Sequence, residues 1–114
     1  MTLPSQPYAV PAARRLGSFD YRVVLAATAE QFGISVESFA QKGNSHISRD
    51  LAAWLARAIS SATLRELSDA FGLTHPDSVS NLTRRADRAL RESARLRGQV
   101  EAIRKSISKN ANRS

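Results

Sequence analysis

The chain has 114 residues, of which 42% are hydrophobic and 24% are charged. This length allows one domain, and the composition excludes a wholly disordered chain while leaving enough apolar residues for a modest core. We expect no transmembrane helix, because no run of about 18 apolar residues exists, and no signal peptide, because residues 1–17 lack a charged and then apolar layout. The lack of cysteine excludes disulfides and thiolate metal sites and fits the cytoplasmic location that we expect.

The positive charge is concentrated near the end of the chain. Seventeen Lys and Arg against ten Asp and Glu give a formal net charge of +7. Residues 1–82 hold seven side chains of each sign, whereas residues 83–114 hold ten basic and three acidic ones. A surplus at one end indicates a polyanionic partner, with nucleic acid first and an acidic membrane surface second; a solubilising tail is the alternative.

The chain order of prolines, glycines and apolar residues predicts a helical domain. Residues 1–17 contain three of the four prolines, and we interpret them as a flexible leader outside the core. Every glycine after the leader interrupts a helical pattern, and no stretch alternates with the period of a strand. We therefore predict an all-α fold, a compact bundle of five to six helices over residues 18–108, followed by a polar tail at 109–114. These glycines are Gly33, Gly43, Gly72 and Gly98.

Two helices are predicted before residue 43. The first has Ser18 as its N-cap and ends at Gly33, and the second runs from Val36 to about Lys42 with Ser35 as its cap. Their apolar residues recur at helical spacing and give each helix one buried face. The predicted inward residues are Tyr21, Val24, Leu25, Thr28 and Phe32 in the first helix and Val36, Phe39 and Ala40 in the second.

A third helix starting at Ser48 has the clearest amphipathic pattern in the chain. Its only tryptophan, Trp54, lies on the apolar stripe, so we interpret it as a core residue and not as a stacking platform for bases. A last short helix is predicted from Gln99 onward, and either it folds back on the bundle or it docks on a partner. The inward residues are Leu51, Trp54, Leu55, Ala58, Ile59 and Ala62 in the third helix and Val100, Ile103 and Ile107 in the last.

Two helix starts follow one another closely after residue 62. Thr63 and Glu66 have the spacing of a capping box, and the short helix that they begin ends at Gly72. Thr74 and Asp77 repeat this spacing, and the proline between them falls in the first turn of the next helix. Two capped helices joined by a glycine-containing turn indicate a helix-turn-helix, and a plain αα-hairpin is the alternative. The inward residues of the first helix are Leu64, Leu67, Ala70 and Phe71.

The arginines of the second helix in this pair favour DNA. On a helical wheel, four of them fall within a band roughly 60° wide, opposite the apolar face. They are Arg84, Arg88, Arg91 and Arg95, which we call the arginine band. Neither Asp87 nor Glu92 lies on the arginine band, so a polyanion that offsets the clustered charge is a better explanation than a solvated face.

Small polar side chains precede the arginine band. Asp77, Ser80 and Asn81 lie near the start of this helix, where side chains can reach base edges. The apolar face carries many alanines and no bulky anchors, which disfavours a membrane-surface helix. The residues of this face are Val79, Leu82, Ala86, Ala89, Leu90 and Ser93.

Several short stretches of the chain match a known family of DNA-binding domains. They are Arg49–Ala52, Leu55–Arg57, Leu64–Leu67, Asp69–Gly72, Val79 and Arg84–Arg85. On these stretches the chain, from Asp20 to about Ser108, resembles the C-terminal DNA-binding domain of bacterial replication initiators of the DnaA family, a helix-turn-helix bundle of the Trp-repressor-like class. A Phe-Gly-Leu turn, Phe71–Leu73, also precedes a Ser-Val-Ser sequence at Ser78–Ser80. In this the chain is more closely similar to the copy of the domain at the C-terminus of REP-associated tyrosine transposases, where such a turn precedes the recognition helix.

The resemblance implies roles for individual residues. Base-reading positions correspond to Thr74, His75, Pro76, Asp77 and Ser78, and phosphate-contacting positions correspond to Arg49, Arg57, Asn81 and Arg85. Proline stands where the initiators have a base-reading histidine, and threonine stands where they have an arginine, so their target sequence is not implied. The loop from which the initiators insert an arginine into the minor groove is shorter here and offers Lys42, Asn44 and His46.

Both relatives are catalytic only through other domains. The chain has no G-x-x-x-x-G-K-S/T loop, and its two histidines, His46 and His75, are 29 residues apart instead of forming the closely spaced pair of the transposase nuclease. We expect that the chain is not an enzyme and that it binds no cofactor, metal ion, membrane or small-molecule substrate. The predicted function is sequence-preferring binding of double-stranded DNA by a monomer in the nucleoid, as a transposase-associated or initiator-like module. The alternative is an interaction module that docks an acidic protein on residues 84–95.

Overall fold

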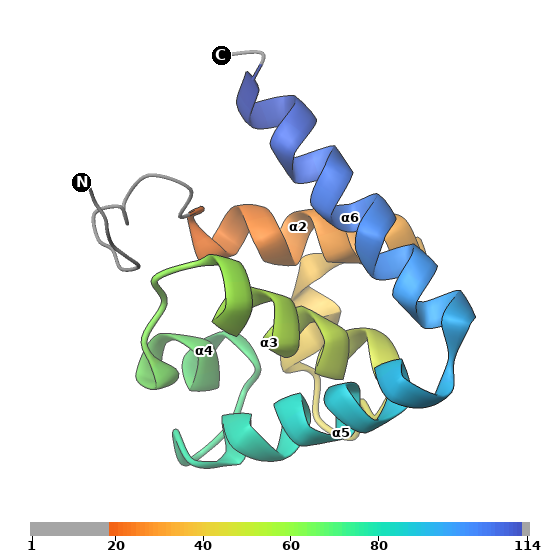
Figure 1. Ribbon diagram of the computed structural model, residues 1–114. Coiled ribbons are helices and arrows are strands. Elements are labelled where there is room, and N and C mark those ends of the chain that lie inside the picture. The colour runs from red at the N-terminus through yellow and green to blue at the C-terminus, as the bar shows by residue number, and fades with distance from the viewer. Residues whose placement is uncertain (1–18, 113–114) are drawn as a thin grey trace, which may run out of the picture.

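The computed structural model describes residues 19–112, with side chains to residue 109, and over this range it is a bundle of helices (Figure 1). No strand forms among these residues, where an isolated bridge pairs Phe19 with Ser60. The predicted all-α fold is confirmed, while the predicted leader at 1–17 lies outside the described residues. The elements are α2 (Tyr21–Phe32), the 3-10 helix η1 (Val36–Ala40), α3 (Ile47–Ile59), α4 (Leu64–Ala70), α5 (Ser78–Glu92) and α6 (Ala94–Asn112).

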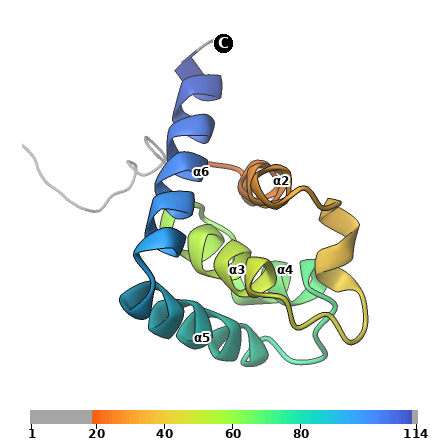
Figure 2. The ribbon, with the colours of Figure 1, turned by 90° about the vertical axis from the view of Figure 1, so that its right-hand side faces the viewer.

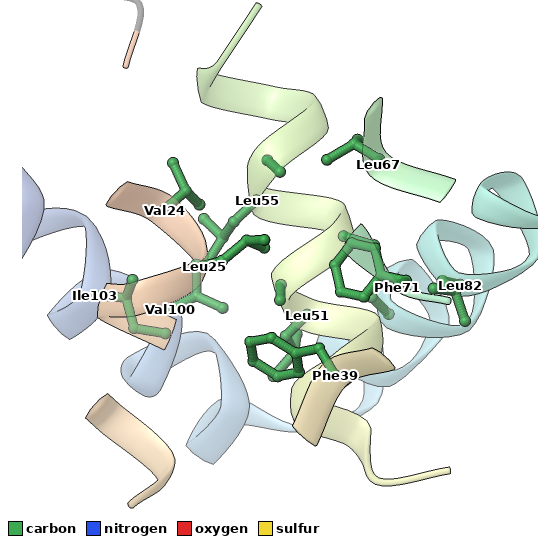
Figure 3. Packing of buried hydrophobic residues seen from close by; sticks show 14 of the residues in the cluster. Val24, Leu25, Phe39, Leu51, Leu55, Leu67, Phe71, Leu82, Val100 and Ile103 are labelled. Carbon is green, nitrogen blue, oxygen red and sulfur yellow. The ribbon is translucent and has the colours of Figure 1, made fainter. Parts of the chain in front are cut away.

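Helix α3 is the centre of the bundle. It packs against α2 on one side and α5 on the other, and α6 leaves the end of α5 and crosses back to α2 (Figures 1 and 2). Leu51 and Leu55 of α3 are fully buried in the core shown in Figure 3, where they lie among side chains of the surrounding helices. These neighbours include Val24, Leu25, Phe39, Leu67, Phe71, Leu82, Val100 and Ile103.

Burial of α3 is wider than its sequence stripe predicts. Ala52, Ala53 and Ala56 are fully buried as well, because helices cover α3 on several sides and small side chains allow them to approach closely. One predicted inward residue, Ala58, is exposed, so that prediction is wrong. Ala62 is half-buried against the core as predicted, but it lies beyond the end of the helix at Ile59. The stripe predicted one buried face, and the structure buries most of the helix.

The ends of α2 are fixed by a carboxylate and a glycine. Asp20 is the N-cap in place of the predicted Ser18, which lies outside the described residues; its Oδ1 accepts a hydrogen bond from the Arg22 backbone N–H at 2.9 Å. The hydrogen bonds and charge of Arg22 hold the pKa of the Asp20 carboxyl below its usual range. At the other end Gly33 has φ of +68°, as predicted for a glycine that ends a helix.

The segment after α2 is shorter and more exposed than predicted. The expected helix to Lys42 is the five-residue 3-10 helix η1, and Ser35 makes no side-chain capping bond. Phe39 is buried, whereas Val36 is 37% exposed and Ala40 is exposed, so two of the three inward predictions are wrong. With three residues per turn, this short element directs one bulky side chain into the core.

Helix α3 begins one residue before the predicted start at Ser48. Its N-cap is His46, whose Nδ1 accepts a hydrogen bond from the Ser48 backbone N–H at 3.1 Å. Histidine is not among the residue types that signal an N-cap, so the sequence pattern favoured the serine two positions later. The connector before it contains Gly43 in a left-handed conformation with φ of +85°.

A break at Ser93 separates α5 from α6. Ser93 is extended, its Oγ accepts a hydrogen bond from the Leu96 N–H, and Arg97 Nη1 donates to the carbonyl oxygens of Leu90 at 2.6 Å and Arg91 at 3.2 Å. The arginine thus satisfies carbonyls at the end of α5, which makes the break stable.

Helix α6 is longer than the predicted helix from Gln99. It starts at Ala94 and continues to Asn112, so the predicted start at Gln99 is wrong, and the helix extends past residue 108 into the segment predicted as a polar tail at 109–114. Gly98 lies inside α6 and does not end a helix. Burial of the predicted apolar residues shows that α6 folds back on the bundle, which the sequence left open. These residues are Val100, Ile103 and Ile107.

Candidate nucleic-acid interface

Helices α4 and α5 follow one another through a short connection. The predicted capping box at the start of α4 is confirmed: Thr63 Oγ1 accepts from the Glu66 N–H at 3.1 Å, and Glu66 Oε1 accepts from the Thr63 N–H at 2.8 Å. Gly72, with φ of +66°, ends α4, and the Leu73 N–H donates to the Ser68 carbonyl at 2.8 Å. These bonds turn the chain sharply toward α5.

The predicted cap at the start of α5 does not form. Asp77 holds the N-cap position in a helical backbone conformation and makes no side-chain capping bond, and Pro76 lies in the turn before the helix, not in its first turn. The N–H groups of Ser78, Val79 and Ser80 donate to backbone carbonyls three residues earlier, at 3.0 to 3.1 Å. Since the turn itself satisfies these groups, no side-chain cap is needed.

The polar residues at this end of α5 are accessible. Of the predicted base-reading set, Thr74, His75 and Asp77 are exposed, while Pro76 and Ser78 are half-buried. Ser80 and Asn81 in the first turn of α5 are exposed too; the structure brings these seven residues together at one end of the helix. Apart from that of Pro76, their side chains carry amide, hydroxyl, imidazole or carboxylate groups, which can pair with base edges.

The face of α5 away from the core carries arginines. Val79, Leu82, Ala86 and Leu90 are buried as predicted, and Arg84, Arg88 and Arg91 are exposed on the opposite side. We call these three arginines the α5 arginine face. Arg95 lies on α6, so its predicted place in the arginine band is wrong, because the wheel continued one helix across the break at Ser93.

The members of the α5 arginine face differ in their partners. Arg91 forms an ion pair with Asp87, and Arg84 Nη2 donates a hydrogen bond to Asn81 Oδ1. The predicted lack of an acidic partner is thus wrong for Arg91, because residues four apart on a helix are neighbours even when their wheel positions differ. Within the described part of the chain, no ion pair or side-chain hydrogen bond involves Arg88.

Arg85 is joined to a buried carboxylate. Its Nε and Nη2 donate to Asp50 Oδ2 and Oδ1 at 3.3 and 3.2 Å. The Asp50 side chain is 6% exposed, whereas that of Arg85 is 54% exposed. Sequence analysis missed Asp50 as a contributor, because no local pattern connects residues 35 positions apart.

Arg49 is tied to the backbone by all three of its guanidinium nitrogens. Nε donates to the Phe39 carbonyl at 2.9 Å, Nη1 to that of Asn44 at 3.3 Å, and Nη2 to that of Phe71 at 2.7 Å. Burial, with repulsion from Arg85, lowers the pKa of Arg49 below its usual range, and the charge of Asp50 opposes this shift. In the structure Arg49 therefore connects η1, the following loop and the end of α4 by hydrogen bonds, and its contact with phosphate stays a prediction.

The other residues implied by the resemblance either lie at a distance from Arg49 or already make hydrogen bonds within the protein. Arg57 is exposed in the last turn of α3, eight residues and about 12 Å along the helix from Arg49. In the loop before α3, Asn44 Nδ2 donates to the Ser38 carbonyl, and the ring of His46 caps the helix. Lys42 is exposed in that loop.

The chain matches no protein-family model, and no curated protein is similar to it at a significant level. Across the described residues, no three His, Cys, Asp or Glu side chains gather in a way that could hold a metal ion. No helix in that part of the chain is long and apolar enough to cross a membrane.

Proposed function

We propose that this chain is a sequence-preferring double-stranded DNA-binding domain in which α4 and α5 form a helix-turn-helix. The observation that carries the proposal is the α5 arginine face: three exposed guanidiniums on one side of a helix whose other side is buried. Such a surface binds a polyanion by replacing the counterions that the phosphates hold. The basic surplus of residues 83–114 gives it long-range attraction as well.

The order of side chains along α5 supports DNA in particular. A recognition helix that enters the major groove by its N-terminus brings its first residues to base edges and its later turns to the backbone. The first turn of α5 holds Ser80 and Asn81, and Asp77 precedes it, which supplies a carboxylate that could accept from a cytosine amino group. The arginines follow in the later turns.

The resemblance to initiator and transposase DNA-binding domains extends the proposal. The chain would serve as the DNA-recognition module of a transposase-associated or initiator-like system, as a monomer in the nucleoid. In those systems other domains carry out the DNA chemistry, so the proposed role for this chain is recognition and not catalysis. An acidic protein that docks on the α5 arginine face is the alternative occupant.

Titration with duplex DNA of random sequence at several salt concentrations tests the proposal. We expect log K to fall linearly with log salt at a slope between about −3 and −6, because each neutralised phosphate releases counterions. Poly-L-glutamate of equal total charge is the control for a general acidic partner. Absence of duplex binding, or equal binding of the polyglutamate, would reject DNA as the partner.

Arg88→Ala is expected to weaken binding to every duplex by about the same factor and to make the salt slope about 1 less negative. The reason is that Arg88 lies beyond the first turns of α5 and has no partner within the described residues. Lys105→Ala, which removes the same charge from an exposed position of α6, is the matched control and should leave the slope nearly unchanged. Equal slopes for Arg88→Ala and the unmodified chain would remove Arg88 from the interface.

Asn81→Ala is expected to reduce the binding free energy by about 1–3 kcal/mol. If Asn81 reads a base, the loss is larger on a preferred duplex, selected from a random pool, than on random DNA. If it contacts a phosphate, as the resemblance implies, the loss is uniform. Binding constants measured on both duplexes distinguish these cases, and no loss on either contradicts the assignment of α5 as the recognition helix.

A further inference from the structure

Asp50 is a buried carboxylate whose described partner is an exposed arginine on another helix. It lies in the first turn of α3, the central helix, and only 6% of its side chain is accessible. Both of its oxygens accept from Arg85 of α5, which gives the two-fold geometry that fixes a guanidinium most firmly. Burial of a carboxylate costs desolvation free energy, so an apolar side chain would stabilise the fold better at this position.

Arg85 keeps donors for a second partner. The bonds to Asp50 use Nε and one N–H of Nη2, which leaves Nη1 and the other N–H of Nη2 without a partner among the described residues. Arg85 follows Arg84 in the chain and lies between the α5 arginine face and the buried side of the helix. Its accessible donors therefore lie beside the surface proposed to bind DNA.

The residue before Asp50 holds the neighbouring element. Arg49 binds the carbonyl of Phe71, at the end of α4, while Asp50 binds Arg85 of α5. Two successive residues of α3 thus contact both helices of the proposed helix-turn-helix. The position of Arg85 is fixed relative to the turn as well as to the core.

We propose that Asp50 is a positioning residue for DNA binding: it holds Arg85 in one orientation, from which Arg85 donates to a backbone phosphate beside α5. This inference depends on the proposed function. Its physical basis is that an arginine ordered during folding loses little further freedom when it binds a phosphate, whereas an unrestrained arginine must be ordered by the DNA itself. Asp50 acts through Arg85 and does not touch the DNA.

Asp50→Asn tests the inference, because the positioning role and simple electrostatics predict opposite changes in DNA affinity. The substitution removes a negative charge near a cationic surface, so electrostatics alone would strengthen DNA binding. The positioning role predicts the opposite, about tenfold weaker binding, because an amide group cannot accept both hydrogen bonds from Arg85. Circular dichroism and thermal unfolding of the same sample establish that the variant is folded.

Arg85→Ala provides the second half of a double-mutant cycle. In this background Asp50→Asn should no longer weaken binding, because the side chain that it positions is gone. A role of Asp50 in stability alone would weaken binding in both backgrounds. Equal or tighter binding by Asp50→Asn, or an equal loss in both backgrounds, overturns the positioning role while the proposed function stands.

If Asp50→Asn does not fold, a second pair of variants tests the positioning role of Asp50. Arg85→Lys keeps the charge but cannot form the two-fold bond, so we expect about tenfold weaker binding with an unchanged salt slope. Arg22→Lys is the control, because Nε and Nη2 of Arg22 make the same two-fold bond to Asp20 at the start of α2, outside the α5 arginine face, and it should bind nearly as the unmodified chain does. Equal effects of the two lysine substitutions overturn the inference, and failure of the unmodified chain to bind any duplex rejects the proposed function itself.

Discussion

Gly72→Ala is expected to reduce the free energy of unfolding by about 3–5 kcal/mol. Two effects add at this position. Gly72 has φ of +66°, which residues with a Cβ rarely adopt, and an added Cβ would lie 2.6 Å from the backbone carbonyl oxygen of Ala40. Because that oxygen belongs to the main chain of η1, it cannot move aside without shifting the element. The midpoint of urea unfolding measures the loss.

Gly33 is a matched control for Gly72. It ends α2 with φ of +68°, and in both places the two residues after the helix donate to carbonyls of its last turn. A Cβ at Gly33 meets nothing within 4 Å, so Gly33→Ala carries the conformational strain without the collision and should reduce the free energy of unfolding by about 1 kcal/mol. Equal losses at Gly72 and Gly33 would show that η1 does not pack against the turn.

Gly98→Ala is expected to increase the free energy of unfolding by about 0.5–1 kcal/mol, because Gly98 lies inside α6 with open space around it. Urea unfolding measures this gain.

Arg49→Ala is expected to reduce the free energy of unfolding by about 3 kcal/mol. Its guanidinium bonds to the carbonyls of Phe39, Asn44 and Phe71 connect η1, the following loop and the end of α4. Removal of the side chain leaves these partly buried acceptors without their donors and opens space beside them. Urea unfolding measures the effect, and the slope of the transition shows whether the variant still unfolds as one unit.

Arg57→Ala is the control for Arg49→Ala. It removes the same charge from the same helix, but Arg57 is exposed and makes no side-chain bond among the described residues, so its effect on unfolding should stay within about 0.5 kcal/mol. Arg49→Lys keeps the charge but cannot reach three carbonyls, and most of the loss should remain. A lysine variant as stable as the unmodified chain would contradict the structural role of Arg49.

The features that the sequence predicted are those with short-range causes. The capping box of Thr63 and Glu66 and the left-handed Gly33 and Gly72 depend on residues a few positions apart, and each is present in the structure. The buried faces of α2 and α5 follow from helical spacing alone. Such signals predicted the fold class and the exposed arginines of α5.

The failures arise where a distant or unusual partner replaces the local signal. The break at Ser93 is stabilised by Arg97, four residues further along, and without it the arginine pattern continues unbroken to Arg95. The N-cap of α3 is a histidine, which sequence patterns do not favour. The bond between Asp50 and Arg85 joins residues brought together only by the packing of α3 on α5. These contacts determine which basic side chains form hydrogen bonds within the protein and which are free to meet a partner.

The break at Ser93 also divides the basic surplus between two helices that run in different directions (Figure 1). Arg84, Arg85, Arg88 and Arg91 belong to α5, while the described basic residues after them belong to α6. For a duplex bound along α5, the charges of α6 act from a distance, and salt screens them over about 8–10 Å. Under the proposed function, the charges of α6 would therefore contribute to the rate at which DNA is captured, whereas the time for which it stays bound would depend on the few contacts made by α5.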